Sequence, residues 1–214
     1  MTDYQNDEEI VDLTRPVEKP ITVPPQKKDH FWWSVVVILL IFIPLRVYVA
    51  EPFLVYGTSM SPTFETGDYL IIDELSYKVS NPQRGDVIVL HPPLAGKEKT
   101  YFIKRIIGLP GETVVVANGK VMIKNASHPS GFYLNESYDV NKSDRADTIT
   151  LGSDEYFVMG DNRPVSDDSR NWGPLKKDEI GGRVLLRLYP FKEIGLFPGS
   201  LGQFGLDQNS YIAK

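Results

Sequence analysis

The sequence predicts a mainly β domain preceded by one transmembrane α-helix. Two observations predict this fold class. A single long apolar run lies near the start of the chain, and the residues after it form short runs rich in β-branched and aromatic side chains, with no long helical period. The 214 residues match one membrane segment plus one domain of ordinary size, and a hydrophobic fraction of 42% is enough for a packed core.

The apolar run covers residues 31–50 and has the length of a membrane-spanning helix, which needs about 20 residues. Arg46 interrupts the run and would extend to the far interface, and Trp32 and Trp33 sit where an interfacial aromatic belt is found. A buried core helix and a signal peptide cleaved near Ala50 are the alternatives. Because residues 47–52 read straight on into the next domain, we expect a transmembrane helix over 31–50.

The charges that flank this run predict its orientation. Lys27 and Lys28 precede it, whereas Arg46 and Glu51 roughly cancel at its end. The positive-inside rule therefore places the N-terminus in the cytoplasm and residues 51–214 outside, as an extracytoplasmic domain. Residues 1–30 are rich in Asp, Glu and Pro without an apolar period, which predicts a disordered cytoplasmic tail.

The chain beyond residue 52 carries mostly β signals, punctuated by Gly, Pro and Asp. Asn118-Gly119 is a strong signal for a type I′ hairpin between its two flanking runs. Residues 125–150 are polar and predict a loop or a small β excursion, and the Gly-rich residues after 190 predict an irregular tail. The predicted strands cover 69–72, 87–90, 101–107, 113–117, 121–124, 156–159 and 184–188.

The composition excludes several function classes. There is no cysteine, which excludes disulfides, thiol catalysis and zinc–thiolate sites. Three histidines argue against a histidine-rich metal site, so we expect no metal and no cofactor. A net charge of -5 provides no large basic face, so nucleic acid is not an expected partner.

Two residues of the domain could form a catalytic pair. Ser59 lies in a Gly-Thr-Ser-x-Ser-Pro context, where a serine alone is typical of a turn or cap. Lys104 lies in the apolar run 101–107, where alternation places it on one face with Phe102 and Ile106. A lysine at a strand edge commonly points to solvent, but apolar neighbours disfavour the charged form. A neutral lysine could take the proton from a serine hydroxyl.

The polar loop over 160–170 has an ordinary interpretation as an exposed turn. A calcium-binding EF-hand starting at Asp161 would need Gly at its sixth position and Glu at its twelfth, but these positions hold Ser166 and Trp172. A third interpretation is support of the catalytic pair. The Ser166 hydroxyl could hold the lysine amine, and an Asp168–Arg170 ion pair could brace the loop.

Beyond about Phe31, the chain resembles bacterial type I signal peptidase, the membrane-bound serine protease that removes signal peptides from exported proteins. Five segments in matching order and spacing carry the resemblance. They are Ser59-Met60-x-Pro62-Thr63, Gly67-Asp68, Arg84-Gly85-Asp86-Val87-Ile88-Val89, Phe102-Ile103-Lys104-Arg105-x-x-Gly108-x-Pro110-Gly111, and Gly160-Asp161-Asn162-Arg163 with Ser166-x-Asp168-Ser169-Arg170.

The resemblance implies an antiparallel β catalytic domain at the bacterial plasma membrane, with the lipid bilayer and signal-peptide-bearing precursors as partners. It implies Ser59 as nucleophile, Lys104 as general base, Ser166 as the hydroxyl that orients the lysine, and Asp168 with Arg170 as a structural ion pair. It also implies substrates with small residues one and three positions before the cut. The residues that would line the pocket for the residue before the cut are Val55, Met60, Phe64, Phe102 and Ile103.

One position departs from part of the family. Some members have a serine two residues before the nucleophile, where its hydroxyl helps to bind the oxyanion, but this chain has Gly57 there, as other members do. The oxyanion hole must then depend on backbone N–H groups, chiefly that of Ser59, and the second donor, a water or another group, stays open.

Two other functions fit parts of the sequence. A self-cleaving regulator of the repressor type also uses Ser and Lys on a β domain, but it would carry a DNA-binding segment where this chain has its apolar run. A non-enzymatic, membrane-anchored β domain that binds partners would need no lysine buried near Ser59.

Overall fold

The computed structural model describes residues 31–48, 50–97, 99–138 and 146–200. The predicted tail over 1–30 and the last residues of the chain, 201–214, lie outside the described part. The chain divides into two units, residues 1–38 and 39–214. The second unit holds all the strands and is called the β unit below.

A helix, α1 (Phe31–Tyr48), forms where the sequence predicted one. In the described ranges, however, no helix has the length and apolar character that a membrane crossing requires. The helical prediction is therefore confirmed, whereas its membrane-spanning role over 31–50 is not and stays a prediction.

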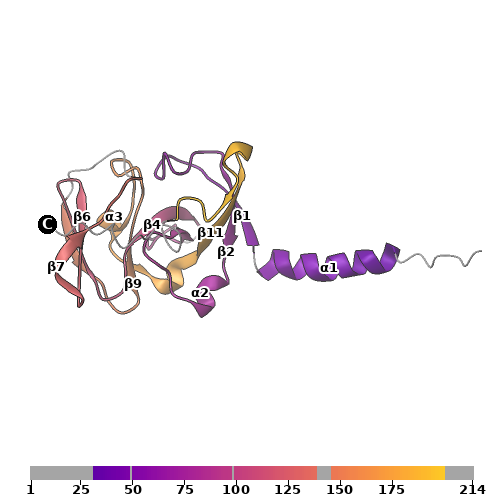
Figure 1. The fold of residues 1–214 in the computed structure, drawn as a ribbon, viewed down its shortest axis with the longest axis horizontal. Helices are drawn as coiled ribbons and strands as arrows, with labels where there is room; N and C mark the ends of the chain where they lie inside the picture. The colour runs from indigo at the N-terminus through magenta and orange to yellow at the C-terminus, as the bar shows by residue number, and fades with distance from the viewer. Residues whose placement is uncertain (1–30, 49, 98, 139–145, 201–214) are drawn as a thin grey trace, which may run out of the picture. The chain divides into compact units, whose positions relative to one another are not determined.

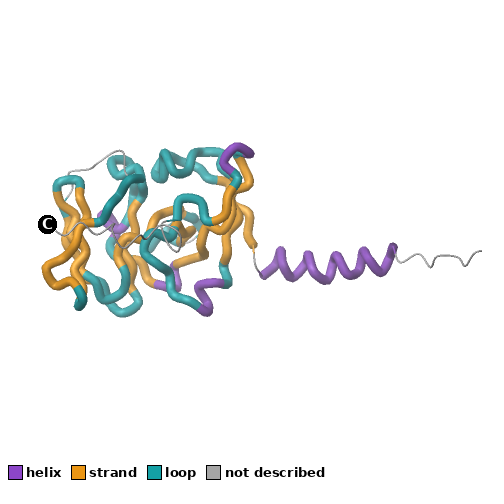
Figure 2. Tube along the Cα trace, viewed as in Figure 1, coloured by secondary structure: helices purple, strands orange, loops and turns teal. Residues whose placement is uncertain are grey.

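The larger sheet of the β unit has eight strands in the order β1-β2-β11-β3-β4-β9-β10, with β12 beside β11, and its pairings are antiparallel (Figures 1 and 2). The predicted mainly β, antiparallel fold is thus confirmed. Its strands are β1 (Ala50–Leu54), β2 (Tyr69–Asp73), β3 (Val87–Leu90), β4 (Phe102–Gly108), β9 (Glu155–Met159), β10 (Leu175–Lys176), β11 (Ile180–Tyr189) and β12 (Gly195–Leu196).

The smaller sheet has four antiparallel strands in the order β7-β6-β5-β8. They are β5 (Thr113–Ala117), β6 (Lys120–Asn125), β7 (His128–Tyr133) and β8 (Asp147–Thr150), so the polar stretch after residue 125 forms a β excursion. Asn118 and Gly119 have φ of 52° and 65°, the positive values that a type I′ turn needs, and they join β5 to β6 as predicted.

The C-terminal part is more regular than the sequence suggested. Strand β11 is ten residues long and pairs with β2, β3 and β12. After Pro190, where an irregular tail was predicted, η2 (Phe191–Glu193) leads into β12, because pairing of Leu186 with Leu196 makes this segment part of the sheet. The remaining short helices are α2 (Ser76–Val79), α3 (Ser169–Trp172) and η1 (Lys177–Glu179).

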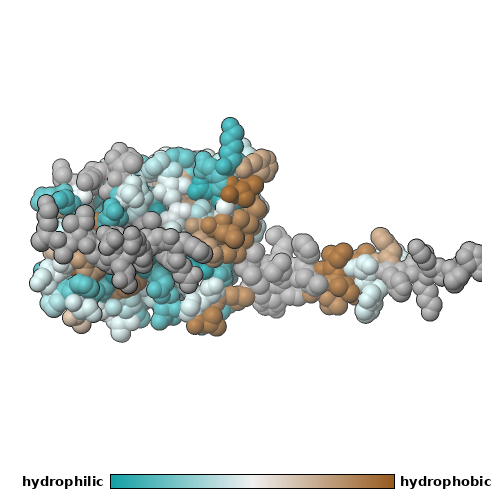
Figure 3. All heavy atoms as spheres, in the orientation of Figure 1, coloured by the Kyte–Doolittle hydropathy of each residue, from teal (hydrophilic) through white to brown (hydrophobic). Residues whose placement is uncertain are grey.

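Both faces of the central strands are buried, which explains their continuous apolar runs. In β3, Val87 and Val89 pack into a cluster with residues of β2 and β11, whereas Ile88 and Leu90 pack on the other face with residues of β4 and β9. Apolar side chains also remain exposed on β1, η2 and β12, including Leu54, Phe191 and Leu196. Figure 3 shows apolar residues gathered at the end of the β unit where β1, β2 and β11 lie.

Candidate active site

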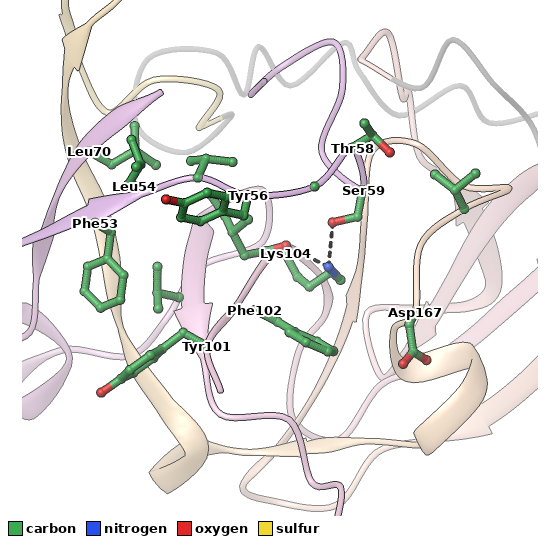
Figure 4. Close-up of a pocket in the computed structure, with 15 residues that line it drawn as sticks. Phe53, Leu54, Tyr56, Thr58, Ser59, Leu70, Tyr101, Phe102, Lys104 and Asp167 are labelled. Carbon is green, nitrogen blue, oxygen red and sulfur yellow. Dashed lines mark hydrogen bonds between the residues drawn. The ribbon is translucent and has the colours of Figure 1, made fainter. Parts of the chain in front are cut away.

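A cleft of about 460 Å³ opens where three segments of the β unit meet (Figure 4). The first is the end of β1 and the turn after it, residues 53–59; the second is the start of β4, residues 101–104. The third is the loop after β9, which contributes Val165 and Asp167. Leu70 and Val89 complete the lining, so the cleft has apolar walls and polar groups at one end.

Ser59 and Lys104 meet in this cleft although they are 45 positions apart in the sequence. The Lys104 Nζ donates a hydrogen bond of 2.8 Å to Ser59 Oγ and another of 2.9 Å to the Ile103 carbonyl. The lysine is only 3% exposed, and its Nζ lies 5.1 Å from the centre of the Phe102 ring. The amine therefore sits in an apolar site without a direct carboxylate partner among the described residues.

The burial of Lys104 changes its acid–base behaviour. Burial lowers the pKa of Lys104 from 10.5 to about 8, against the nearby charges of Asp168, Asp167 and Asp161, which raise it. With a pKa of about 8, about one amine in ten is neutral at pH 7, compared with fewer than about one in a thousand for a free lysine. The geometry thus joins a hydroxyl to a base that can accept its proton.

Two buried side chains anchor the turn that carries Ser59. Met60 and Phe64 are 1% and 0% exposed and pack in the cluster beneath the cleft, and the Phe64 N–H donates to the Met60 carbonyl at 3.0 Å. The loop after β9 holds the turn from the other side. The backbone N–H of Asn162 donates to the Ser59 carbonyl at 3.0 Å, and its Nδ2 donates to the Thr58 carbonyl at 3.1 Å.

Gly160 lies at the closest approach between these two loops. A Cβ at this position would collide with the Ser59 carbonyl oxygen and with Ser166 Oγ, so only glycine fits. Strand β9 ends at Met159, which is paired with Arg105, and the chain turns away at Gly160. The pairing between β4 and β9 therefore begins at Arg105 and does not reach Lys104. Residues 102–104 pair with β3 on one edge, and their other edge has no strand partner in the described part of the chain.

The three predicted supporting residues lie below the pair. Ser166 Oγ and Asp168 Oδ2 both accept hydrogen bonds from the Gly160 N–H, at 3.1 and 3.0 Å. Arg170 contacts both oxygens of Asp168 at 2.8 Å. Burial would raise the pKa of Asp168, but the hydrogen bond and charge of Arg170, together with hydrogen bonds from Ser166 and the Gly160 N–H, hold the pKa below the usual value. Ser166 is not among the hydrogen-bond partners of the amine found in the described residues.

The predicted pocket residues divide into two groups. Val55, Phe102 and Ile103 line the cleft, whereas Met60 and Phe64 lie in the core beneath it. Sequence reasoning did not identify Tyr56, Tyr101, Val165 and Asp167, which also line the cleft. The available signal was sequence adjacency, because each lies within three residues of a predicted site residue.

A second network that sequence reasoning missed lies on the other face of β4. Arg105, only 1% exposed, contacts both oxygens of Asp161 at 2.8 and 2.6 Å and donates to the Gly85 carbonyl at 3.0 Å. Asp161 Oδ2 also accepts a hydrogen bond of 2.5 Å from Thr63 Oγ1, which lies in the turn that carries Ser59. An arginine in an apolar strand was the signal, because a buried guanidinium needs an acceptor.

The backbone N–H groups near Ser59 are the candidate donors for an oxyanion. Gly57 has a φ of +96°, and its N–H is already bonded to Thr66 Oγ1 at 3.0 Å. The N–H of Ser59 has no acceptor within the described ranges, which leaves it available as a donor beside the hydroxyl. No cluster of three or more His, Cys, Asp or Glu side chains suited to a metal ion occurs in the described residues.

Comparisons with known proteins place the chain in a family. The family model described as "Signal peptidase, peptidase S26" matches residues 28–189. "Probable signal peptidase I-2" of Synechocystis sp. is 36% identical over 162 residues, which cover 74% of this chain and 72% of the relative. "Signal peptidase I" of Leptolyngbya laminosa is 38% identical over 163 residues, or 73% and 77% of the two chains. A solved signal peptidase I from Enterococcus faecalis is 34% identical with a TM-score of 0.41, over 50% of this chain and 98% of that one. The chain belongs to the signal peptidase family, peptidase S26.

Proposed function

We propose that this protein is a serine endopeptidase that removes N-terminal signal peptides from exported precursor proteins, with Ser59 as nucleophile and Lys104 as general base. The observation that carries the proposal is the 2.8 Å hydrogen bond between Lys104 Nζ and Ser59 Oγ at the bottom of an apolar cleft. Membership of the family supports the reaction and the substrate class. No cofactor or metal takes part in the proposed reaction.

The reaction follows from the positions of the groups. Neutral Lys104 takes the proton of Ser59 Oγ as this oxygen attacks the carbonyl carbon of the residue before the cut. The N–H of Ser59 stabilises the oxyanion, and the lysine ammonium then gives its proton to the leaving amine. Water, deprotonated by Lys104, attacks the acyl-enzyme ester and releases the signal peptide with a free carboxylate. Ser59 regains its proton and the cycle closes.

The substrate binds as an extended strand. Residues 53–57 comprise the end of the edge strand β1 and the residues that follow it, and the segment before Lys104 has one edge not paired with β9, so a peptide can hydrogen-bond to backbone on both sides. Val55, Phe102 and Ile103 line the wall that receives the residue before the cut, and Met60 and Phe64 support this wall from below. We expect Ala, Gly or Ser to fit there and a large side chain to be excluded.

The supporting residues act on the backbone around the pair. Asp168 and Arg170 form a buried ion pair that holds the Gly160 N–H, and Ser166 supplies a second acceptor for the same group. Since Gly160 packs on the backbone of Ser59, these three side chains position the nucleophile. In this proposal Ser166 acts through the Gly160 backbone, whereas the resemblance implied a direct contact between its hydroxyl and the Lys104 amine.

The sequence and the family support a proposed location for the enzyme at the membrane. In this proposal, residues 31–50 anchor the enzyme in the lipid bilayer of the bacterial plasma membrane, residues 1–30 remain in the cytoplasm, and residues 51–214 form the extracytoplasmic catalytic domain. The apolar run and its flanking lysines support this topology. The chain should resist alkaline extraction from membranes, and protease added outside should cut only beyond residue 52. An active extracytoplasmic reporter at the N-terminus would contradict the orientation.

The decisive experiment incubates the purified full chain in detergent with a precursor that carries a signal peptide. The wild type should release the mature protein, and Ser59→Ala should not. Ser61→Ala is the matched control, because the Ser61 hydroxyl bonds to Glu65 at 2.5 Å and not to the lysine. An inactive Ser61 variant beside an active Ser59 variant would refute the assignment of the nucleophile. A self-cleaving regulator would cut its own chain and leave the precursor intact, and a non-enzymatic domain would cut neither.

A further inference from the structure

Among the described residues that line the cleft, only the side chains of Lys104 and Asp167 carry a formal charge (Figure 4). Lys104 must be neutral when it acts as a base, so the working cleft contains the negative charge of Asp167 alone. The proposed reaction does not use this carboxylate. Since a charge in a cleft selects its substrates by sign, Asp167 has a consequence for specificity.

The loop after β9 directs Asp167 away from the buried network. Ser166 and Asp168 on either side of it are 8% and 0% exposed and both bind the Gly160 N–H, whereas Asp167 is half-buried and faces the cleft. Its carboxylate accepts a hydrogen bond of 2.8 Å from Asn171 Nδ2. Within the described ranges it forms no ion pair, so its charge is not neutralised by the protein.

The charge of Asp167 reaches the reacting groups. Burial lowers the pKa of Lys104, and after Asp168 the carboxylate of Asp167 is the strongest of the charges that raise it. Asp168 is paired with Arg170, but Asp167 has no such partner among the described residues. A substrate charge beside Lys104 will therefore also interact with the charge of Asp167.

The cleft places Asp167 on the side of the leaving group. Figure 4 shows Phe53 and Tyr101 at one end of the cleft, and Asp167 on the other side of the Ser59–Lys104 pair. In the binding mode proposed above, Val55 and Ile103 receive the residue before the cut, so the residues that precede it run along the backbone of 53–57 toward Phe53. The chain that follows the cut must then leave across Val165 and Asp167.

We propose that Asp167 selects the charge of the first residues after the cut, favouring a cationic side chain and disfavouring an acidic one. This inference rests on the proposed function, and it concerns the start of the mature protein and not the signal peptide. For a half-buried pair, each change of one unit of substrate charge should alter kcat/KM about threefold, so Lys and Glu precursors should differ about tenfold. The difference should shrink with added salt.

The test uses three precursors that differ only in the first residue after the cut, Lys, Gln or Glu. The kcat/KM of each is measured at low and at high salt with the wild type, Asp167→Asn and Asp167→Lys. Asp167→Asn keeps an acceptor for Asn171, and Asp178→Asn is the matched control because Asp178 is exposed on η1 and lies outside the cleft. The ratio of two substrates on one enzyme cancels any change in Lys104 itself.

We expect the Lys:Glu ratio to be about ten in the wild type and in Asp178→Asn, near one in Asp167→Asn, and below one in Asp167→Lys. Equal cleavage of the three precursors by the wild type, or a ratio that Asp167→Asn leaves unchanged, would overturn the inference while leaving the peptidase function intact. Failure of the wild type to cut any precursor would overturn both.

Discussion

The two faces of strand β4 bury two cations in opposite ways. Lys104 faces Ser59 and a backbone carbonyl, whereas the next residue, Arg105, faces both oxygens of Asp161. Both side chains are almost fully buried, at 3% and 1% exposed. Burial without a carboxylate partner lowers the pKa of Lys104 to about 8. Arg105 is buried with a bidentate carboxylate partner, Asp161, and its guanidinium also binds the carbonyl groups of Gly85 and Gly199.

The difference indicates what would separate a reactive cation, the role proposed for Lys104, from a structural one, Arg105, on the same strand. A lysine can lose its charge when it is desolvated, and the neutral amine is then a base. An arginine remains charged, so its burial requires compensating acceptors, which Asp161, Gly85 and Gly199 provide. The reactive face is therefore expected to be sensitive in activity, and the structural face in stability.

Exchange of the cation type on the reactive face should have the largest effect. Lys104→Arg should lower precursor cleavage at neutral pH by about 10³-fold or more, because a guanidinium cannot accept the serine proton. Lys104→Ala should be equally inactive. Lys120→Arg is the matched control, since Lys120 lies over Tyr133 in the smaller sheet and should keep full activity. Full cleavage by Lys104→Arg would rule out the Ser–Lys mechanism.

Loss of the carboxylate on the structural face should mainly reduce stability. Asp161→Ala leaves Arg105 buried without its partner and should lower the free energy of unfolding by about 3–5 kcal/mol, measured by denaturant titration. Glu193→Ala is the control, because Glu193 pairs with Arg187 but is 59% exposed and should cost no more than about 1 kcal/mol. Equal losses in the two variants would show that burial does not decide the strength of these pairs.

Replacement of Lys104 on the reactive face should raise the free energy of unfolding, whereas loss of Asp161 lowers it. Between pH 8 and 10.5, Lys104 is protonated in the unfolded chain but neutral in the folded one. The lowered pKa therefore reduces the free energy of unfolding below pH 8, and this reduction disappears as the pH rises to 10.5. The shift from 10.5 to about 8 corresponds to about 3 kcal/mol. Lys104→Met should therefore stabilise the fold at pH 7 by up to this amount and leave it inactive. A loss of stability would mean that the lysine has a hidden structural role.

The sequence allowed one half of this comparison to be predicted. Lys104 lies in an apolar run whose alternation places it beside Phe102, and that pattern alone indicates desolvation. The Arg105–Asp161 pair could not be read in the same way, because it joins residues 56 positions apart and depends on how β4, β9 and the turn around Thr63 pack. The pocket role of Met60 and Phe64 stays a prediction: both side chains lie in the core beneath the cleft, and the sequence does not distinguish a pocket wall from the core just behind it.

The same division holds for the fold. Asn118-Gly119 was predictable because a type I′ turn depends on two local φ values. Strand β11 was predicted only in part, because Gly181, Gly182 and Arg183 interrupt the apolar pattern at its start. A Cβ at Gly182 would collide with the Asp73 carbonyl oxygen on the neighbouring strand, so contact with β2 selects this glycine.

The pH dependence of activity gives a finer test of the reactive face. Because the base must be neutral, kcat/KM should rise with pH through an apparent pKa of about 8, well below that of a free lysine. Asp167→Asn should move the midpoint to lower pH, since it removes one of the charges that raise this pKa. Asp178→Asn should leave the midpoint unchanged. A wild-type midpoint near 10.5 would contradict desolvation of Lys104.

The smallest effect is expected from Ser166, whose loss should reduce both stability and activity slightly. Its hydroxyl accepts the Gly160 N–H together with Asp168, so Ser166→Ala leaves this group one acceptor and should cost at most about 1 kcal/mol of stability. Because Gly160 packs on the Ser59 backbone, the loss should misplace the nucleophile and lower kcat several-fold to about tenfold, with KM and the pH midpoint unchanged. Ser169→Ala is the matched control from the same loop: the Ser169 hydroxyl holds Val158 in β9 at 3.0 Å, so its loss should cost similar stability without the change in kcat. If Ser166→Ala instead moved the pH midpoint, the hydroxyl would act directly on the lysine amine in the substrate complex, and its place would be on the reactive face.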